Sequence, residues 1–92
     1  MSGTICVRVR VSGRVQGVGF RRFTEANAQD KDVKGWVRNL PGGGVEAVLE
    51  GERKKVGELL SLMKEGPAGA MVSGIELAEL EIRGFSEFKV IY

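Results

Sequence analysis

The stretch CVRVRVSGRVQGVGFRRFTEANAQD, residues 6–30, places a strand pattern, a glycine-rich loop and a helix pattern in direct succession. Residues 6–12 alternate valine with mostly polar residues, which is typical of a strand with one buried face. Residues 12–22 contain three glycines, three arginines and no acidic residue. Residues 21–30 carry a thin apolar face that predicts a helix. The stretch therefore predicts a flexible, positively charged loop between a strand and a helix.

The middle of the chain predicts a hairpin and a second helix. Residues 34–40 (KGWVRNL) and 45–51 (VEAVLEG) have strand patterns, and the turn PGGG at residues 41–44 separates them. Residues 53–65 carry one apolar stripe at helical spacing, formed by Val56, Leu59, Leu60 and Met63. A Gly-Pro dipeptide follows this stripe and is a typical helix stop.

Two strand patterns complete the chain and decide its fold class. Residues 71–83 contain apolar tracts at 75–77 and 80–82 that are out of phase, so we expect a bulge or break between them. Residues 88–92 (FKVIY) predict a last short strand. Two helices in this order of strands must cover one face of an antiparallel sheet. We predict an α+β, ferredoxin-like βαββαβ sandwich, a fold that hosts many unrelated functions.

Composition is that of one small domain. The 92 residues are 42% hydrophobic, and we expect a single domain over residues 1–92. The apolar runs are too short for a membrane-spanning helix, and residues 1–10 lack the apolar core of a signal peptide. Cys6 is the single cysteine, which excludes an internal disulfide. We expect it to be buried in a strand rather than reactive, in a cytoplasmic protein with no membrane partner.

Charge is unevenly distributed, although the net charge is only +2. Residues 1–23 contain five arginines and no acid, which indicates either a solvated basic surface or an anion site at the glycine loop. The chain has no histidine, the usual side chain for proton transfer near neutral pH. No group of cysteines or carboxylates has metal-ligand spacing, so we expect no metal and no cofactor.

Three partial motifs for nucleotides and nucleic acids fail. GVGFRR begins like a dinucleotide-binding loop, but Arg22 stands where the third glycine is required. The Gly-Lys-Ser or Gly-Lys-Thr ending of a Walker loop is absent. RGFSEFKV, residues 83–90, begins like an RNA-contact strand, but Glu87 occupies the position of the second ring and the segment lies in the wrong strand. We therefore expect no nucleic-acid partner.

The glycine loop has two interpretations on physical grounds. Glycines allow successive backbone N–H groups to turn inward around an anion, and the N-terminus of a following helix adds further N–H groups. Arg21, in the first helical turn, offers a guanidinium that can donate two hydrogen bonds to a phosphate. The alternative is an ordinary glycine turn whose arginines face water. The loop alone does not decide between them.

Two long motifs resemble those of the acylphosphatase family. The loop signature of that family fits Val11, Gly13, Val15, Gln16, Gly17, Val18, Phe20 and Arg21. Its second signature fits Gly35, Trp36, Val37, Arg38, Asn39, Gly43, Val45 and Gly51. The resemblance spans essentially the whole chain. It implies the ferredoxin-like fold and a small cytosolic enzyme that hydrolyses carboxyl-phosphate mixed anhydrides to a carboxylate and inorganic phosphate.

The resemblance also implies roles for individual residues. Arg21 resembles the residue that holds the substrate phosphate, and Asn39 resembles the one that orients the attacking water. The phosphate cradle would consist of backbone N–H groups of Val15, Gln16, Gly17, Val18, Gly19 and Phe20. Without the resemblance, Asn39 would be interpreted as an ordinary residue at the start of a turn, where asparagine is common.

The chemistry implied by the family suits the residues present. The carboxylate leaving group has a pKa of roughly 4 to 5 and needs no general acid. Phosphoryl transfer depends mainly on positioning and charge neutralisation. We therefore expect a monomer that acts on a small-molecule acyl phosphate. The alternatives are a non-catalytic phosphate-binding module of the same fold and, less favoured because the chain spans only this domain, part of a hydrogenase-maturation carbamoyltransferase.

Three residues depart from the family pattern. Lys31 replaces an apolar residue at the end of the first helix, so we expect Lys31→Leu to stabilise the protein, or the lysine to extend along the core edge. Asp32 replaces a glycine suited to positive φ. Arg22 stands where an aromatic residue is frequent, and we expect its side chain to face solvent.

Overall fold

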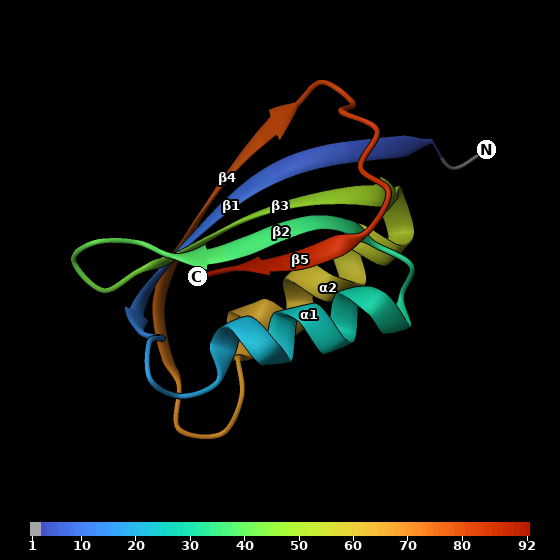
Figure 1. Cartoon of the computed structure of the whole chain (residues 1–92). Helices are drawn as coiled ribbons and strands as arrows, with labels where there is room; N and C mark the ends of the chain where they lie inside the picture. Colours follow the sequence, from blue (N-terminus) through green and yellow to red (C-terminus); the bar gives the residue numbers. More distant parts are fainter. Residues whose placement is uncertain (1–2) are drawn as a thin grey trace.

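Five strands form one sheet, and two helices cover one of its faces (Figure 1). The computed structural model describes residues 3–92. The elements are β1 (Thr4–Arg14), α1 (Phe20–Asp30), β2 (Lys34–Asn39), β3 (Val45–Glu52), α2 (Arg53–Glu65), β4 (Met71–Leu80) and β5 (Phe88–Ile91). The strand order is β4-β1-β3-β2-β5. The predicted ferredoxin-like α+β sandwich is confirmed.

The sheet is mixed, because its last strand is parallel to its neighbour. β1 pairs antiparallel with β3 and β4, and β2 pairs antiparallel with β3, as predicted. β5 pairs parallel with β2, which corrects the expectation of a wholly antiparallel sheet. The connection at residues 81–87 crosses the end of the sheet where both β4 ends and β2 begins (Figure 1). A strand that starts at that end can only run in the direction of β2.

The core lies between the sheet and the helices. β1 contributes alternate residues to it, as the valine pattern predicts, and β3 does the same. α2 buries Val56, Leu59 and Met63. Leu60 is partly buried and packs against the same core. α1 buries only Phe20, Thr24 and Ala28, so its apolar face is as thin as its sequence indicates. None of the helices within residues 3–92 is long and apolar enough to cross a bilayer.

The predicted break in the fourth strand pattern is wrong. β4 pairs with β1 without interruption from Gly74 to Leu80, and the register shifts earlier, opposite Ser12 and Gly13. Leu77 lies opposite Val9 on the helix-covered side, whereas Leu80 lies opposite Cys6 on the other side. Leu80 is the last residue of β4 and Ile82 lies beyond it, so the change of phase falls at the end of the strand rather than at a break within it.

The end of α1 explains two departures from the family pattern. Asp32 has φ 57, so this position does adopt the left-handed conformation expected there. The Lys31 side chain is only 18% exposed, and its Nζ lies 3.4 Å from Glu58 Oε1 on α2. Lys31 therefore lies along the core edge and links the two helices. Lys31→Leu would remove this ion pair and fill the core edge with an apolar side chain, so its effect on stability stays a prediction.

Candidate active site

The loop between β1 and α1 is shaped by glycines. Gly17 and Gly19 have φ values of 75 and 80, which glycine adopts without strain. Gly19 is the N-cap of α1, and its carbonyl accepts the Phe23 N–H at 2.9 Å. No side chain caps this end of the helix. The first N–H groups of α1 therefore have no intrahelical partner and are available to a ligand.

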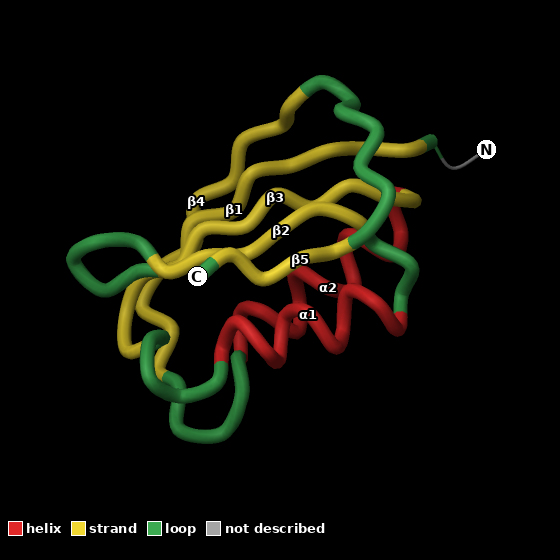
Figure 2. Tube along the Cα trace, in the orientation of Figure 1, coloured by secondary structure: helices red, strands yellow, loops and turns green. Residues whose placement is uncertain are grey.

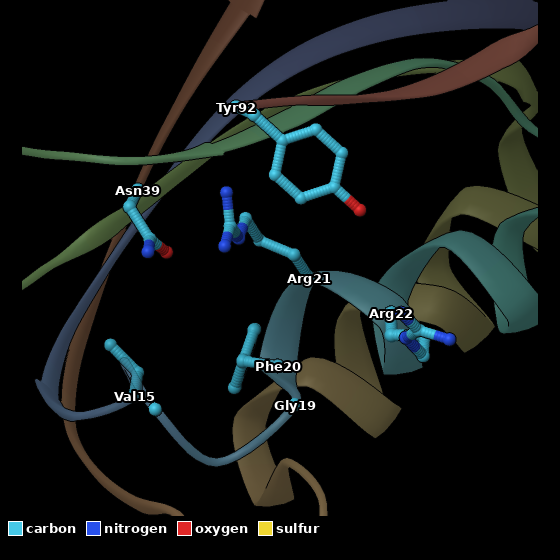
Figure 3. A pocket seen from close by; sticks show the side chains of 8 residues that line it. Val15, Gly19, Phe20, Arg21, Arg22, Asn39 and Tyr92 are labelled. Atoms are coloured by element: carbon cyan, nitrogen blue, oxygen red, sulfur yellow. The ribbon is translucent and has the colours of Figure 1, made fainter.

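A small pocket lies beside this loop (Figure 3). Its volume is about 150 Å³, and its lining comes from the loop, the first turn of α1, the end of β2 and the C-terminal residue. The lining residues are Val15, Gly17, Gly19, Phe20, Arg21, Arg22, Asn39 and Tyr92. The structure thus brings together six of the eight residues predicted for the site. Gln16 and Val18 are not among the lining residues.

Arg21 is oriented by the C-terminal end of the chain. Its Nη1 donates a hydrogen bond to the Ile91 carbonyl oxygen at 3.4 Å. The guanidinium carbon lies 4.7 Å from the centroid of the Tyr92 ring, in a cation–π arrangement. Figure 3 shows the guanidinium directed across the pocket toward Asn39. Guanidinium has five N–H donors, so most of them remain available to an anion.

Asn39 and Arg22 differ in how they face the pocket. Asn39 is the last residue of β2, lies opposite Val45, and directs its amide into the pocket (Figure 3). Within residues 3–92 its side chain makes no hydrogen bond. Arg22 is exposed and its side chain points away from Asn39 and Arg21 (Figure 3), as the sequence predicts. It is nevertheless one of the residues that line the pocket.

The two remaining predicted residues have other contacts. Val18 is partly buried and packs against the core. The Gln16 side chain points to the turn between β2 and β3, where its Nε2 donates to the carbonyl oxygens of Leu40 and Gly44, both at 2.8 Å. Their backbone N–H groups belong to the predicted cradle, but their side chains serve the surrounding structure.

Sequence reasoning did not assign Tyr92 to the site. The residue is 90% exposed, and its ring contacts the Arg21 guanidinium beside the pocket. The only signal in the sequence was an aromatic residue at the end of the last strand pattern. That signal indicates a site residue only once β5 is known to run parallel to β2, because this direction brings its end beside Asn39.

The pocket is electropositive. Its lining contains Arg21 and Arg22 and no Asp or Glu side chain. Glu46, on the helix-free side of β3, is held by Arg10 at 2.8 Å and by Arg38 at 2.7 Å. Burial opposes its charged form, but the hydrogen bonds from the two arginines outweigh burial and lower the pKa of Glu46.

Within residues 3–92 no group of His, Cys, Asp or Glu side chains is arranged to hold a metal ion.

Comparisons with known proteins agree on one family. The acylphosphatase family model matches residues 7–90. An acylphosphatase of Methanothrix thermoacetophila is 73% identical over 89 residues, which cover 97% of this chain and 99% of that protein. The acylphosphatase structure from Coxiella burnetii has a TM-score of 0.92 and 40% identity, covering 96% of this chain and 93% of that one. A region of full-length HypF, in its phosphate- and nucleotide-bound form, has a TM-score of 0.92 and 30% identity and covers 100% of this chain but 12% of HypF.

The match over most of the chain shows that it belongs to the acylphosphatase family. Its function is acylphosphatase activity, and its substrate is a small-molecule acyl phosphate. The family and the activity predicted from the two motifs are therefore confirmed. The alternative of a phosphate-binding module without turnover is not favoured.

Proposed function

We propose that the pocket performs the hydrolysis with Arg21 as the phosphate clamp and Asn39 as the residue that orients water. The observation that carries this assignment is their placement: both side chains face one electropositive pocket, beside the glycine loop and the N-terminus of α1. The two residues are 18 positions apart in the sequence and meet because β1 and β2 run in the same direction.

Phosphate binding is assigned to the loop and Arg21 together. Backbone N–H groups of residues 15–20 and the positive end of α1 favour a phosphate at this place. Arg21 adds a fixed positive charge and donors suited to two phosphate oxygens. Its contacts with Ile91 and Tyr92 hold the guanidinium in place before substrate arrives. Such preorganisation is the main source of catalysis in phosphoryl transfer.

The attacking water is assigned to the Asn39 amide. The water oxygen forms a bond to phosphorus while the bond from phosphorus to the acyl oxygen breaks. The carboxylate leaves with the electron pair and needs no proton, because its pKa is roughly 4 to 5. We place the proton from water on an oxygen of the substrate phosphate. An amide can hold the water through one hydrogen bond while remaining neutral itself.

We further propose that the enzyme acts as a monomer in the cytoplasm, without a nucleic-acid or membrane partner. Support comes from the modest net charge of +2 and the failed nucleic-acid motifs. Sedimentation of the purified protein would test the assembly state.

Substitutions in the pocket test the proposed roles. Arg21→Ala should weaken inhibition by inorganic phosphate and lower kcat, because the guanidinium binds both substrate and transition state. Arg21→Lys should recover little, since a point charge lacks two parallel donors. Asn39→Ala should lower kcat while the inhibition constant of phosphate stays near the wild-type value. The measurement is hydrolysis of benzoyl phosphate at several phosphate concentrations.

The neighbouring arginine provides the control. Arg22→Ala removes the same charge from an exposed side chain that points away from the pocket. At physiological salt it should change kcat and the inhibition constant by less than about threefold. Equal damage from Arg22→Ala and Arg21→Ala would contradict the assignment of the clamp.

A further inference from the structure

Gln16 is the one predicted cradle residue whose side chain bonds outside the loop. Both of its hydrogen bonds come from Nε2, which donates to the carbonyl oxygens of Leu40 and Gly44 at 2.8 Å. The acceptors are 24 and 28 positions away in the sequence. A primary amide has two N–H donors on one nitrogen, so these two contacts use them both.

The acceptors belong to the turn that follows Asn39. Leu40 is the next residue, and its N–H donates to the Gly44 carbonyl at 2.7 Å. The Gly43 N–H donates back to the Leu40 carbonyl at 3.3 Å. The Gln16 amide therefore binds the two carbonyls that close this turn. The amide thereby holds the carbonyl group of Leu40, the residue that follows Asn39, to which the water is assigned.

This contact joins the two halves of the pocket. The strands that carry the loop and Asn39 are not neighbours, because β3 lies between β1 and β2. Within residues 3–92 no other hydrogen bond connects the loop of residues 15–19 with residues 39–44. Apart from the Gln16 side chain, the loop and the turn are connected through the strand pairing of β1, β3 and β2.

The residue type follows from the acceptors. The carbonyl oxygens of Leu40 and Gly44 require two N–H donors. The side chain that carries these donors must be as long as that of glutamine to reach both oxygens from position 16. Asparagine is one methylene shorter. Glutamate offers no N–H, and its carboxylate would face two carbonyl oxygens beside the phosphate loop. Lysine would add a charge and lacks the planar pair of donors. Glutamine satisfies both carbonyls with no net charge.

We propose that Gln16 is a positioning residue that sets the place of Asn39 relative to the phosphate cradle. Its side chain does not contact the substrate, since it is directed at the turn rather than into the pocket. Gln16 holds the turn, and the turn sets the position of Asn39. Through Asn39 it determines the direction from which water approaches phosphorus. The inference rests on the proposed role of Asn39 as the residue that orients water.

The test is a double-mutant cycle between Gln16 and Asn39. Gln16→Met keeps the length of the side chain and removes both donors, so kcat should fall by about tenfold or more, as misplacement of a reacting group does. The inhibition constant of inorganic phosphate should change by less than about twofold, because the cradle N–H groups remain. In the Asn39→Ala background, Gln16→Met should lower kcat by less than about twofold, because the positioned group is already absent.

A matched control and a second variant complete the test. Gln29→Met makes the same substitution at an exposed position of α1 and should leave kcat and the inhibition constant unchanged. Gln16→Asn adds no charge, but its amide is one methylene too short to reach both carbonyl oxygens, so it should reproduce the loss of kcat if Gln16→Met does not fold.

Equal losses of kcat from Gln16→Met in both backgrounds would overturn the inference. So would a loss of phosphate affinity in proportion to the loss of kcat. Full activity of Asn39→Ala would instead contradict the proposed role of Asn39, so the two failures are distinguishable.

Discussion

Arg21 shows how much of this site depends on the surroundings of one side chain. Its backbone lies in the first turn of α1, its Nη1 bonds to the Ile91 carbonyl, and the Tyr92 ring lies against its guanidinium. A long, flexible side chain loses considerable entropy when a ligand orders it. Contacts that order it beforehand therefore strengthen both binding and catalysis.

Asp32 is a residue held in an unfavourable conformation. Its φ of 57 lies in the left-handed region, where a side chain costs roughly 1–2 kcal/mol and aspartate somewhat less. Its ion pair with Lys34 is exposed and contributes little. Asp32→Gly should therefore raise the free energy of unfolding by about 0.5–1 kcal/mol. Chemical denaturation with urea measures this change.

Asp30 provides a control two positions earlier. It is the last residue of α1, where glycine has no conformational advantage. Asp30→Gly should lower the free energy of unfolding by up to about 1 kcal/mol. A loss of stability in Asp32→Gly similar to that in Asp30→Gly would show that the strain at Asp32 is absent.

At the level of elements, the connection between β4 and β5 is attached to the sheet by one carboxylate. Glu50, on the helix-free side of β3, accepts hydrogen bonds from the backbone N–H groups of Arg83, Gly84 and Phe85. Burial opposes its charged form, but these three hydrogen bonds outweigh burial and lower its pKa. The connection therefore crosses the end of the sheet in a fixed path and delivers β5 to the edge of β2.

Loss of this attachment should destabilise the fold. In Glu50→Gln the amide has one carbonyl oxygen in place of two carboxylate oxygens and presents N–H groups to backbone donors. We expect a decrease of about 2 kcal/mol in the free energy of unfolding at pH 7, typical of lost hydrogen bonds to a buried charge. Glu52→Gln, at the exposed end of the same strand, should change it by less than about 0.5 kcal/mol. Equal effects would contradict the attachment by Glu50.

At the scale of the whole molecule, the site lies at one end of the sheet and the Glu50 attachment at the other. β1, β2 and β5 run in one direction, so their C-terminal ends lie at the same end of the sheet (Figure 2), which is the end where the pocket lies. Residues 70 positions apart, Arg21 and Ile91, come into contact there. The site therefore depends on the arrangement of β1, β2 and β5 within the sheet.

Stability should fall in acid because of two buried carboxylates. The pKa values of Glu46 and Glu50 are lowered in the folded protein from an ordinary value of 4.5. The stability that they contribute is present above that value and is lost as the pH falls through the lower folded values. We expect the denaturation midpoint to be level between pH 7 and 5 and to fall below about pH 4.5. The difference between wild type and Glu50→Gln should shrink over the same range, and a constant difference would contradict this cause.

Hydrolysis should proceed without an added metal ion. The Arg21 guanidinium and the loop N–H groups are positioned to neutralise the phosphate charge that a metal neutralises in other phosphotransfer enzymes. We expect the rate of benzoyl phosphate hydrolysis to be the same before and after treatment with EDTA. A large loss that magnesium restores would show that the side chain and backbone donors are insufficient.

Local patterns in the sequence predicted most of the elements, and the resemblance to a family supplied the two proposed catalytic positions. The valine alternation of β1, the apolar stripe of α2 and the turn between β2 and β3 depend on neighbouring residues alone, so their periods predict them. Arg21 and Asn39 followed from two motifs, and the structure places both in one pocket. The positive φ of Asp32 was also predictable, because it depends on the end of a single helix.

The tertiary structure alone decided the direction of β5, the contact of Tyr92 with Arg21, and the bonds from Gln16 to the turn. It also decided the partner of Lys31 on α2. The contacts made by Arg21, Gln16 and Lys31 join positions at least 24 residues apart. A hydrophobic period specifies which face of an element is buried, but it carries no information about the direction of a distant strand or the partner of a polar side chain. Those depend on where the chain crosses the sheet, which only the packed molecule defines.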